Sequence, residues 1–232
     1  MWEANKLESA QVKTIIYKLG VDICGIASVD RFCDAPARFH PRDIYDKCNS
    51  VIVYGIKAPS EVLFIKNTLP YTNIQDRLEQ HLDYIGLKAA RLLEEYNIKA
   101  IPMPTDKPYE YFDQTRQHGQ ALLSMRHAAW LAGLGILGKN TLLINNVHGN
   151  LLSLGAILID APLESDSLAD YLNRACPENC RLCLDSCPHS ALDGKTVDQW
   201  KCRPMSNYKI GNNFNVKICN MCRKVCPSAL SV

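Results

Sequence analysis

The sequence predicts an α+β fold, with a main domain over residues 1–170 and a small cysteine-rich domain over residues 171–232. Three observations carry this prediction. Residues 50–56 are almost entirely apolar, as expected of a buried strand, and residues 72–96 place apolar side chains at helical spacing. Eight of the eleven cysteines lie after residue 175. Mixed helices and strands followed by clustered cysteines indicate two unlike units.

The other elements of the main domain follow from local patterns. Apolar residues at helical spacing predict a helix over residues 7–19, which Gly20 ends. Strands are expected at 21–27 and 98–103, and residues 161–171 are expected to connect the two domains. Two segments rich in proline or polar residues are expected to be irregular loops: residues 34–41 and 104–116.

The end of the main domain is expected to contain one more helix and a hairpin. Residues 117–132 predict the helix, which ends at the glycine-rich segment 133–140. Two apolar runs, 141–145 and 151–160, are expected to pair as a β-hairpin that turns at residues 148–150.

The cysteines form two groups with the same ending, C-x2-C-x3-C-P. They are Cys176, Cys180, Cys183 and Cys187 in the first group, Cys202 alone, and Cys219, Cys222 and Cys226 in the second. This ending is typical of the bacterial two-cluster ferredoxin motif, in which the cysteine before the proline ligates the other cluster.

The crossing rule predicts the ligands of two [4Fe-4S] clusters. The first cluster is expected to bind Cys176, Cys180, Cys183 and Cys226, and the second Cys187, Cys202, Cys219 and Cys222. Because each cluster takes thiolates from both groups, cluster binding is expected to contribute folding energy to this region.

One spacing departs from the ferredoxin motif, because three residues instead of two separate Cys176 from Cys180. A one-residue bulge through Pro177 and Asn179 keeps Cys176 as a ligand. Otherwise the first cluster has three protein thiolates and is a three-iron or labile centre. Tetrahedral zinc is the alternative metal, although it does not need the repeated C-P ending.

A disulfide framework is not expected, because the chain shows no secretory signal and its cysteine count is odd. Outside the two groups, Cys24, Cys33 and Cys48 show no ligand spacing and are interpreted as buried free thiols. No apolar run approaches the roughly twenty residues of a membrane helix. The sequence therefore predicts a cytoplasmic protein without a membrane partner.

The charge of the cysteine-rich part is interpreted as compensation for the clusters. Residues 172–232 contain nine Lys or Arg and four Asp or Glu, a surplus of five positive charges. Two oxidised clusters of about −2 each nearly cancel this surplus. The charge therefore gives no reason to expect a nucleic-acid partner.

The glycine-rich segment over residues 132–141 reads A-G-L-G-I-L-G-K-N-T. By itself it suits a helix C-cap with close backbone packing, because it follows a helix and lacks the spacing of a phosphate loop. Together with the cysteines and the L-G-x-x-L-x-D pattern at 154–160, it resembles the epoxyqueuosine reductases and the related reductive dehalogenases. The resemblance covers about residues 118–227.

The resemblance implies a nitroreductase-like main domain that binds cobalamin, followed by a ferredoxin-like domain that feeds it electrons. Glycines let the backbone approach a flat macrocycle closely, and Lys139 and Asn140 are expected to bond its amide rim. The cofactor-binding residues implied in this way are Gly133, Leu134, Gly135, Gly138, Lys139, Asn140 and Thr141.

The family's proton-donating aspartate is not matched, since its position falls at Gly119 and Asp113 is out of register. The candidate catalytic proton donors are then His127, His118, His148, Tyr109 and Tyr111, each of which also suits a surface or packing role. His127 is expected to face the cofactor, and His148 is expected at an exposed hairpin tip. The family's C-terminal repeat helices are not matched after Cys226, which argues against tRNA as the substrate.

Three functions remain open. The first is an iron–sulfur oxidoreductase that passes electrons through two [4Fe-4S] clusters to a bound corrinoid for reduction of a small substrate, with ferredoxin or flavodoxin as electron donor. The second is an electron-transfer module or a reductive activator for a partner corrinoid protein. The third is an FMN-dependent reductase, placed last because no basic phosphate pocket is visible in the sequence.

Overall fold

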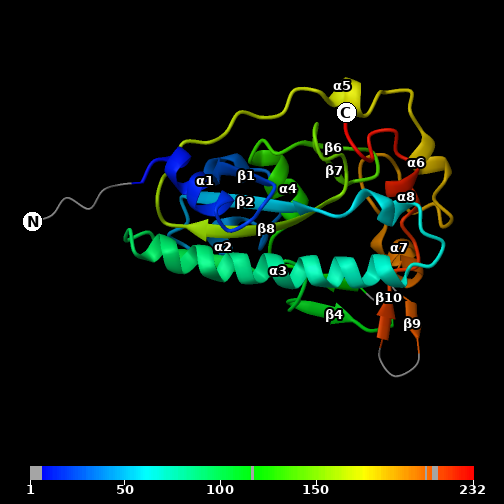
Figure 1. Cartoon of the computed structure of the whole chain (residues 1–232), viewed down its shortest axis with the longest axis horizontal. Helices are drawn as coiled ribbons and strands as arrows, with labels where there is room; N and C mark the ends of the chain where they lie inside the picture. Colours follow the sequence, from blue (N-terminus) through cyan, green and yellow to red (C-terminus); the bar gives the residue numbers. More distant parts are fainter. Residues whose placement is uncertain (1–6, 116–117, 207, 211–213) are drawn as a thin grey trace, which may run out of the picture.

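The computed structural model describes residues 7–115, 118–206, 208–210 and 214–232. It is a mixed α/β fold built on a four-stranded antiparallel sheet with the order β1-β2-β8-β3 (Figure 1). The strands are β1 (Ile23–Ser28), β2 (Ser50–Lys57), β8 (Leu152–Ile159) and β3 (Ala100–Met103). The sheet therefore places a late strand, β8, between two early ones.

The central strands are buried on both faces because helices cover the sheet on each side. In β2, Val51 and Val53 pack into one apolar cluster, while Ile52 and Tyr54 pack into the other. This alternation follows from the two-residue period of a strand. The nearly continuous apolar run at 50–56 is thus explained by burial on both faces.

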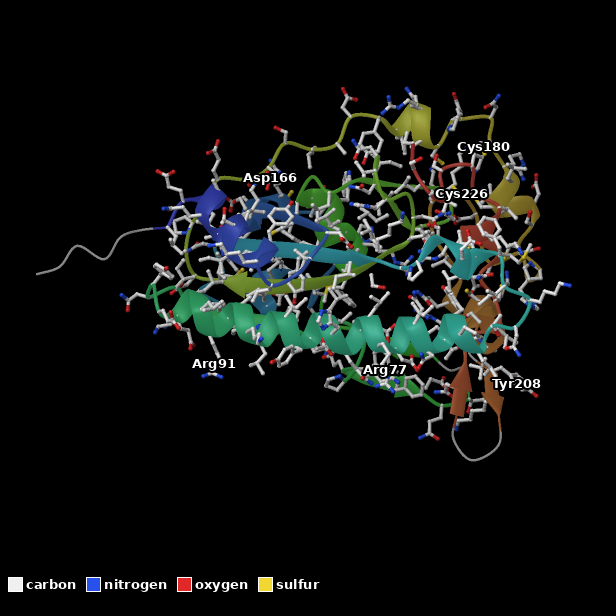
Figure 2. The ribbon with its side chains drawn as sticks, in the orientation of Figure 1. Arg77, Arg91, Asp166, Cys180, Tyr208 and Cys226 are labelled. Atoms are coloured by element: carbon white, nitrogen blue, oxygen red, sulfur yellow. The ribbon has the colours of Figure 1, made fainter. Side chains whose placement is uncertain are left out.

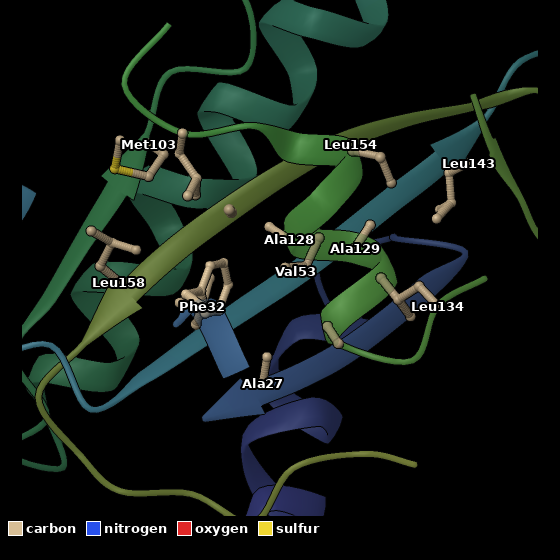
Figure 3. Close-up of a cluster of buried hydrophobic side chains, with 14 of the residues drawn as sticks. Ala27, Phe32, Val53, Met103, Ala128, Ala129, Leu134, Leu143, Leu154 and Leu158 are labelled. Carbon is tan, nitrogen blue, oxygen red and sulfur yellow. The ribbon is translucent and has the colours of Figure 1, made fainter. Parts of the chain in front are cut away.

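Three helices make the two covering layers. Helices α1 (Ser9–Tyr17) and α3 (Leu69–Glu94) pack on one face, and α4 (Met125–Leu131) packs on the other. Figure 3 shows α4 crossing the strands, with Ala128 and Ala129 turned toward Val53. Small alanine side chains let this helix lie close to the sheet.

Tyr54 is the largest fully buried side chain and needs two glycines around it. A Cβ on Gly86 of α3 would lie 2.5 Å from its hydroxyl, and a Cβ on Gly155 of β8 would lie 2.7 Å from its ring. The hydroxyl donates a hydrogen bond to the Leu82 carbonyl at 3.1 Å. The phenol therefore sits in the core without an unpaired polar group.

Two predictions about the end of the main domain are wrong. A helix was expected over residues 117–132, of which the structure describes 118–132, and these do not form one helix. β5 (His118–Gln120) precedes α4, and β5 pairs with β4 (Tyr111–Asp113) in a segment expected to be irregular. The expected hairpin is also absent from the described residues. β7 (Leu143–Ile144) pairs with β6 (Ile136–Leu137), whereas β8 enters the sheet centre, where both of its apolar faces are covered.

The remaining elements are short. Before residue 170 they are η1 (Val29–Phe32), α2 (Pro41–Ile44) and η2 (Ser60–Leu63). In the cysteine-rich part they are α5 (Leu172–Ala175), α6 (Leu182–Asp185), α7 (Gln199–Ser206), β9 (Tyr208–Ile210), β10 (Phe214–Val216) and α8 (Met221–Lys224).

The cysteine-rich part packs against one end of the sheet and of α3 (Figure 1). Ala229 joins an apolar cluster with Tyr71 and Leu151, and the Lys217 ammonium lies 2.8 Å from the Glu79 carboxylate on α3. The domain boundary at residue 170 stays a prediction. Within the described part of the chain, no helix has the length and apolar character that crossing a membrane requires.

Candidate functional site

Four of the predicted ligand cysteines surround one cavity, which we call the first cysteine cavity. Cys176, Cys180, Cys183 and Cys226 all line it, together with Lys139 and Asn140. Figure 2 labels Cys180 and Cys226 at the same end of the molecule, although they belong to different cysteine groups. The fold therefore brings Cys226, which precedes Pro227 at the end of the second group, to the cysteines of the first group.

The other four cysteines surround a second cavity, the second cysteine cavity. Its cysteines are Cys187, Cys202, Cys219 and Cys222. The partition into two sets of four is the one that the crossing rule predicts. Among the described residues, no three His, Cys, Asp or Glu side chains have the close geometry that a single metal ion needs.

The electrostatics of the thiols follow the same partition. Burial raises the pKa of Cys183, and Cys176, Cys226 and Cys180 raise it further. Burial likewise raises the pKa of Cys222 to about 11, with further raising contributions from its three cavity partners and an opposing one from Arg223. Without a metal to stabilise thiolates, these thiols are held in the protonated form.

Lys139 and Asn140 join the sheet part to the two cysteine loops. The Lys139 ammonium donates hydrogen bonds to the carbonyl oxygens of Pro177 and Cys180, both at 3.0 Å, and to that of Glu178. Its backbone N–H lies 3.4 Å from the Cys176 sulfur. Lys139 therefore holds the loop between Cys176 and Cys180, which is one residue longer than in the ferredoxin motif.

Asn140 fixes the other loop. Its side-chain amide donates to the Cys222 carbonyl at 3.0 Å, and its side-chain oxygen accepts from the Leu142 N–H at 3.1 Å. Because Asn140 is buried, both bonds are shielded from water. Its position between the two cysteine cavities suits a residue that sets their separation.

The glycines of the segment lie close to protein backbone. A Cβ on Gly133 would be 2.2 Å from the Ser167 carbonyl oxygen, and one on Gly135 would be 2.4 Å from that of Ile144. Gly138 faces the Ile144 side chain, and Leu134 is buried in the core. Their spacing is thus used for internal packing, while a role in cofactor binding stays a prediction.

A third cavity, the central cavity, lies between the sheet part and the cysteine-rich part. It encloses about 210 Å³. Charged side chains from separate segments line it: Glu79, Asp106, Arg126, Arg203, Lys217 and Arg223. Sequence reasoning missed this basic group, because the four cations come from α4, α7, α8 and the strand end near β10 and share no local motif.

Two buried polar atoms of the central cavity have no hydrogen-bond partner among the residues that the structure describes. They are the Thr105 hydroxyl oxygen and the Asn150 side-chain oxygen. The Asn150 amide nitrogen is occupied, since it donates to the Arg223 carbonyl at 3.2 Å. An unpaired buried polar atom is costly, so these two atoms mark a place for a polar ligand.

Arg126 lies between the central cavity and the second cysteine cavity, because it lines both. Its guanidinium donates to the carbonyl and the hydroxyl oxygen of Thr141, at 2.7 and 2.9 Å. Burial and the positive charges of Arg203 and Arg223 lower the pKa of Arg126 to about 10. The guanidinium therefore stays charged at neutral pH.

Tyr109 occupies the space beside Gly119, the position to which the predicted resemblance assigns the family's aspartate. A Cβ on Gly119 would lie 2.5 Å from the Tyr109 ring. The Tyr109 hydroxyl donates to Asp106, a residue of the central cavity, at 2.5 Å. Burial, followed by this hydrogen bond, raises the pKa of Tyr109, so the phenol keeps its proton at neutral pH.

The three candidate histidines do not line the central cavity. His127 faces a different space, an outer pocket of about 470 Å³ that Phe32, Phe39 and Trp130 also line. Its ring nitrogen Nδ1 lies 2.7 Å from the Ser124 hydroxyl, and burial lowers its pKa. No cavity described above includes His118 or His148 in its lining.

The surroundings of one of these histidines, His148, differ from the expectation. His118 lies in β5 opposite Asp113. His148 is partly buried instead of exposed, in a turn that an isolated antiparallel bridge between Asn145 and Gly149 closes. Tyr111 is exposed.

The cysteines outside the two groups are only partly as predicted. Cys24 and Cys48 are buried, and burial raises the pKa of their thiols to about 12 and about 11. Cys33 is exposed, so its interpretation as a buried thiol is wrong. It follows the short helix η1, and its side chain is open to solvent.

Two four-thiol cavities beside a polar third cavity form the arrangement expected of an iron–sulfur redox protein. Comparison with known proteins finds similar chains among reductases. No protein-family model matches the chain. The chain is 26% identical to the epoxyqueuosine reductase of Leadbetterella byssophila, over 94% of this chain and 79% of that protein. With the enzyme of Cyclobacterium marinum it shares 28% identity, over 93% and 77%.

Solved structures show the same fold. The epoxyqueuosine reductase of Streptococcus thermophilus superposes with a TM-score of 0.64 at 18% identity, covering 95% of this chain and 65% of that one. A catabolic reductive dehalogenase superposes with a TM-score of 0.72 at 18% identity, covering 98% of this chain and 33% of that one. The predicted resemblance to epoxyqueuosine reductases and reductive dehalogenases is therefore confirmed.

Another comparison bears on the partners. One epoxyqueuosine reductase with a TM-score of 0.62 was solved with a modified tRNA stem loop. For this chain, the prediction that nucleic acid is not a partner stays a prediction. The chain spans just under two thirds of that structure, 64% of its length.

Proposed function

We propose that this protein is an iron–sulfur oxidoreductase that carries electrons through two [4Fe-4S] clusters to an acceptor in the central cavity, where a corrinoid binds and a small substrate is reduced. The proposal includes a nitroreductase-like main domain and a ferredoxin-like cluster domain. One observation carries it: the eight cysteines separate into two sets of four around two cavities, and the second set adjoins the central cavity.

The donor sets suit the clusters. Thiolates are the ligands of four-iron clusters, and each cluster needs four of them. The first would be held by Cys176, Cys180, Cys183 and Cys226, and the second by Cys187, Cys202, Cys219 and Cys222. When bound, such clusters supply one-electron transfer. The raised thiol pKa values imply that cluster assembly releases protons and is favoured at higher pH.

The polar lining of the central cavity supports a corrinoid, but its size sets a limit. The unpaired Asn150 oxygen calls for an N–H donor, and the Thr105 hydroxyl calls for a polar partner, which the amide groups around a corrin would provide. Pockets that enclose drug-sized ligands measure roughly 300–1,000 Å³. A cavity of about 210 Å³ takes only part of a corrinoid, so the rest would cover its open side.

The chain's own residues have clear tasks in this proposal. Lys139 and Asn140 hold the two cysteine loops in place. Arg126, Arg203 and Arg223 supply positive charge to the central cavity. Tyr109, bonded to Asp106, holds a proton near that cavity and is the candidate donor in place of the family's aspartate. A corrinoid, when bound, supplies redox chemistry at cobalt.

A second function is favoured by two specific observations. The aspartate position is Gly119, filled by the Tyr109 ring, and the central cavity is smaller than a corrinoid. Both suit an electron-transfer module that reduces the cobalt of a partner corrinoid protein. FMN was placed last because no basic phosphate pocket was visible in the sequence. The central cavity has a basic lining, so this reason no longer holds and the test includes flavin.

The test is anaerobic reconstitution of the full chain, followed by iron and sulfide analysis and titration with hydroxocobalamin or FMN. About eight irons per chain are expected, because each cubane holds four. Saturable uptake of one hydroxocobalamin, with a shift of the cobalt spectrum, supports the first function. Cobalt reduction only in the presence of a separate corrinoid protein supports the second. Uptake of FMN instead of cobalamin refutes both corrinoid proposals.

The ligand sets are tested by two substitutions. Cys202→Ala is expected to remove the second cluster and leave the first, whereas Cys226→Ala is expected to do the reverse, because each residue lines only one cysteine cavity. Iron near four per chain and one remaining EPR signal, different in the two variants, are the expected results. Loss of the same signal in both variants would contradict the assignment.

A further inference from the structure

The two cysteine cavities differ in the cations around them. Arg126 and Arg203 both line the second cysteine cavity. Among described residues, the first cysteine cavity has Lys139 as its basic lining residue, and the Lys139 ammonium is bound to three backbone carbonyls. The second cavity therefore has two guanidinium groups where the first has one occupied ammonium.

Arg126 is held firmly in its place. Thr141 has a φ of 60°, a left-handed conformation that β-branched residues rarely adopt. In this conformation both its carbonyl and its hydroxyl accept hydrogen bonds from Arg126. Strained backbone persists only where surrounding contacts maintain it. The paired hydrogen bonds thus fix a positive charge between the second cysteine cavity and the central cavity.

A fixed positive charge stabilises the more negative state of a neighbouring redox group. Reduction adds one negative charge to a cluster, and a cation nearby favours that change most where water is excluded. The guanidinium of Arg126 lines the cavity itself and is partly shielded from water. Cluster potentials are known to depend on such charges and on hydrogen bonds to sulfur.

We propose that Arg126 makes the second cluster easier to reduce than the first, and so directs electrons from the first cluster through the second into the central cavity. One electron leaves the first cluster and one enters the second, and no proton or bond is exchanged in this step. The reductant is a low-potential one-electron donor, which dithionite replaces in the test. This inference depends on the proposed function, because it requires both clusters.

The test is an EPR-monitored redox titration of the reconstituted full chain. Arg126→Gln is expected to lower the potential of the second cluster and leave the first within error. A tenfold change in the reduction equilibrium, which is about 59 mV for one electron, is the expected scale. Arg91→Gln is the matched control, since Arg91 is exposed on α3 and appears in Figure 2 far from Cys226.

Two further variants keep the test decisive. Arg126→Lys retains the charge and loses the paired geometry. The reduction potential of the second cluster should therefore stay close to its wild-type value. If Arg126→Gln does not assemble eight irons, Arg203→Gln removes the other shared guanidinium and should shift the same cluster in the same direction. The Cys202→Ala and Cys226→Ala proteins assign the signals.

The outcomes separate this inference from the proposed function. Absence of two cluster signals in the wild-type protein refutes the proposed function. Two signals in the wild type, with an unchanged second potential in a fully loaded Arg126→Gln, refute the inference alone. An equal shift of both clusters, or an equal loss in Arg126→Lys, also refutes it, because the effect would then come from structure rather than from the local charge.

Discussion

Lys139 offers the sharpest test of how the glycine-rich segment supports the first cysteine cavity. Lys139→Met keeps most of the aliphatic stem and removes the ammonium, which now contacts three carbonyl oxygens of the loop 177–180. For partly exposed groups, each such hydrogen bond contributes about 1 kcal/mol net. The expected loss is therefore about 3 kcal/mol, or roughly a hundredfold increase in opening of this loop.

Two assays measure this opening. Amide hydrogen exchange should speed up at Cys180, whose N–H donates to the Pro177 carbonyl at 3.0 Å inside this loop. In the reconstituted protein, a chelator should remove iron from the first cluster about a hundredfold faster and from the second at the wild-type rate. Lys195→Met is the control, because Lys195 is an exposed lysine on a turn of the same cysteine-rich part.

The reasoning about Lys139 fails under either of two results. If exchange at Cys180 and iron release both match the wild type, the three carbonyl contacts do not hold the loop. If both clusters lose iron equally fast, Lys139 supports the whole cysteine-rich part instead of one loop.

Two further predictions concern stability. Tyr54→Phe removes the buried hydroxyl that donates to the Leu82 carbonyl, so urea unfolding should show a loss of about 1–3 kcal/mol in unfolding free energy, and an unchanged midpoint would contradict this. The hydrogen bond to Asp166 at 2.5 Å raises the pKa of Lys13 above its ordinary value of 10.5. This stabilisation is fully present below pH 10.5 and is lost as pH rises through the folded-state pKa. Thermal unfolding between pH 8 and 11.5 should show that alkaline loss in the wild type and a smaller one in Lys13→Met; identical curves would refute it.

Much of the fold was predictable because it depends on local patterns. The strand at 50–56 and the helix at 72–96 were recognised from apolar spacing, and both exist as β2 and α3. The hairpin was not predictable in this way. Residues 151–160 carry the pattern of a buried strand, but that pattern does not name a partner, and β8 pairs with β2 and β3, which lie far away in sequence.

In the candidate site, too, the features that depend on sequence motifs were predictable and those that depend on tertiary packing were not. Local cysteine spacing identified the two groups, and the crossing rule of two-cluster ferredoxins assigned their members to two sets. The structure places the same two sets around two cavities, while their role as cluster ligands stays a prediction. The expectation that His127 faces the cofactor stays a prediction, and the structure adds only which space His127 lines. Helix α4 turns His127 toward the outer pocket and Arg126 toward the central cavity, and adjacent helical residues point in different directions.

The sequence by itself determined the class of fold, the two cysteine sets and the resemblance to a family of redox enzymes. Each of these depends on motifs in short stretches of the sequence, where the spacing of side chains indicates a strand, a helix or a ligand loop. The central cavity and its charged lining became visible only in the tertiary structure. Arg126, Arg203, Lys217 and Arg223 meet there from separate segments. Such a meeting depends on how whole elements pack, because burial energy acts on the sum of distant surfaces.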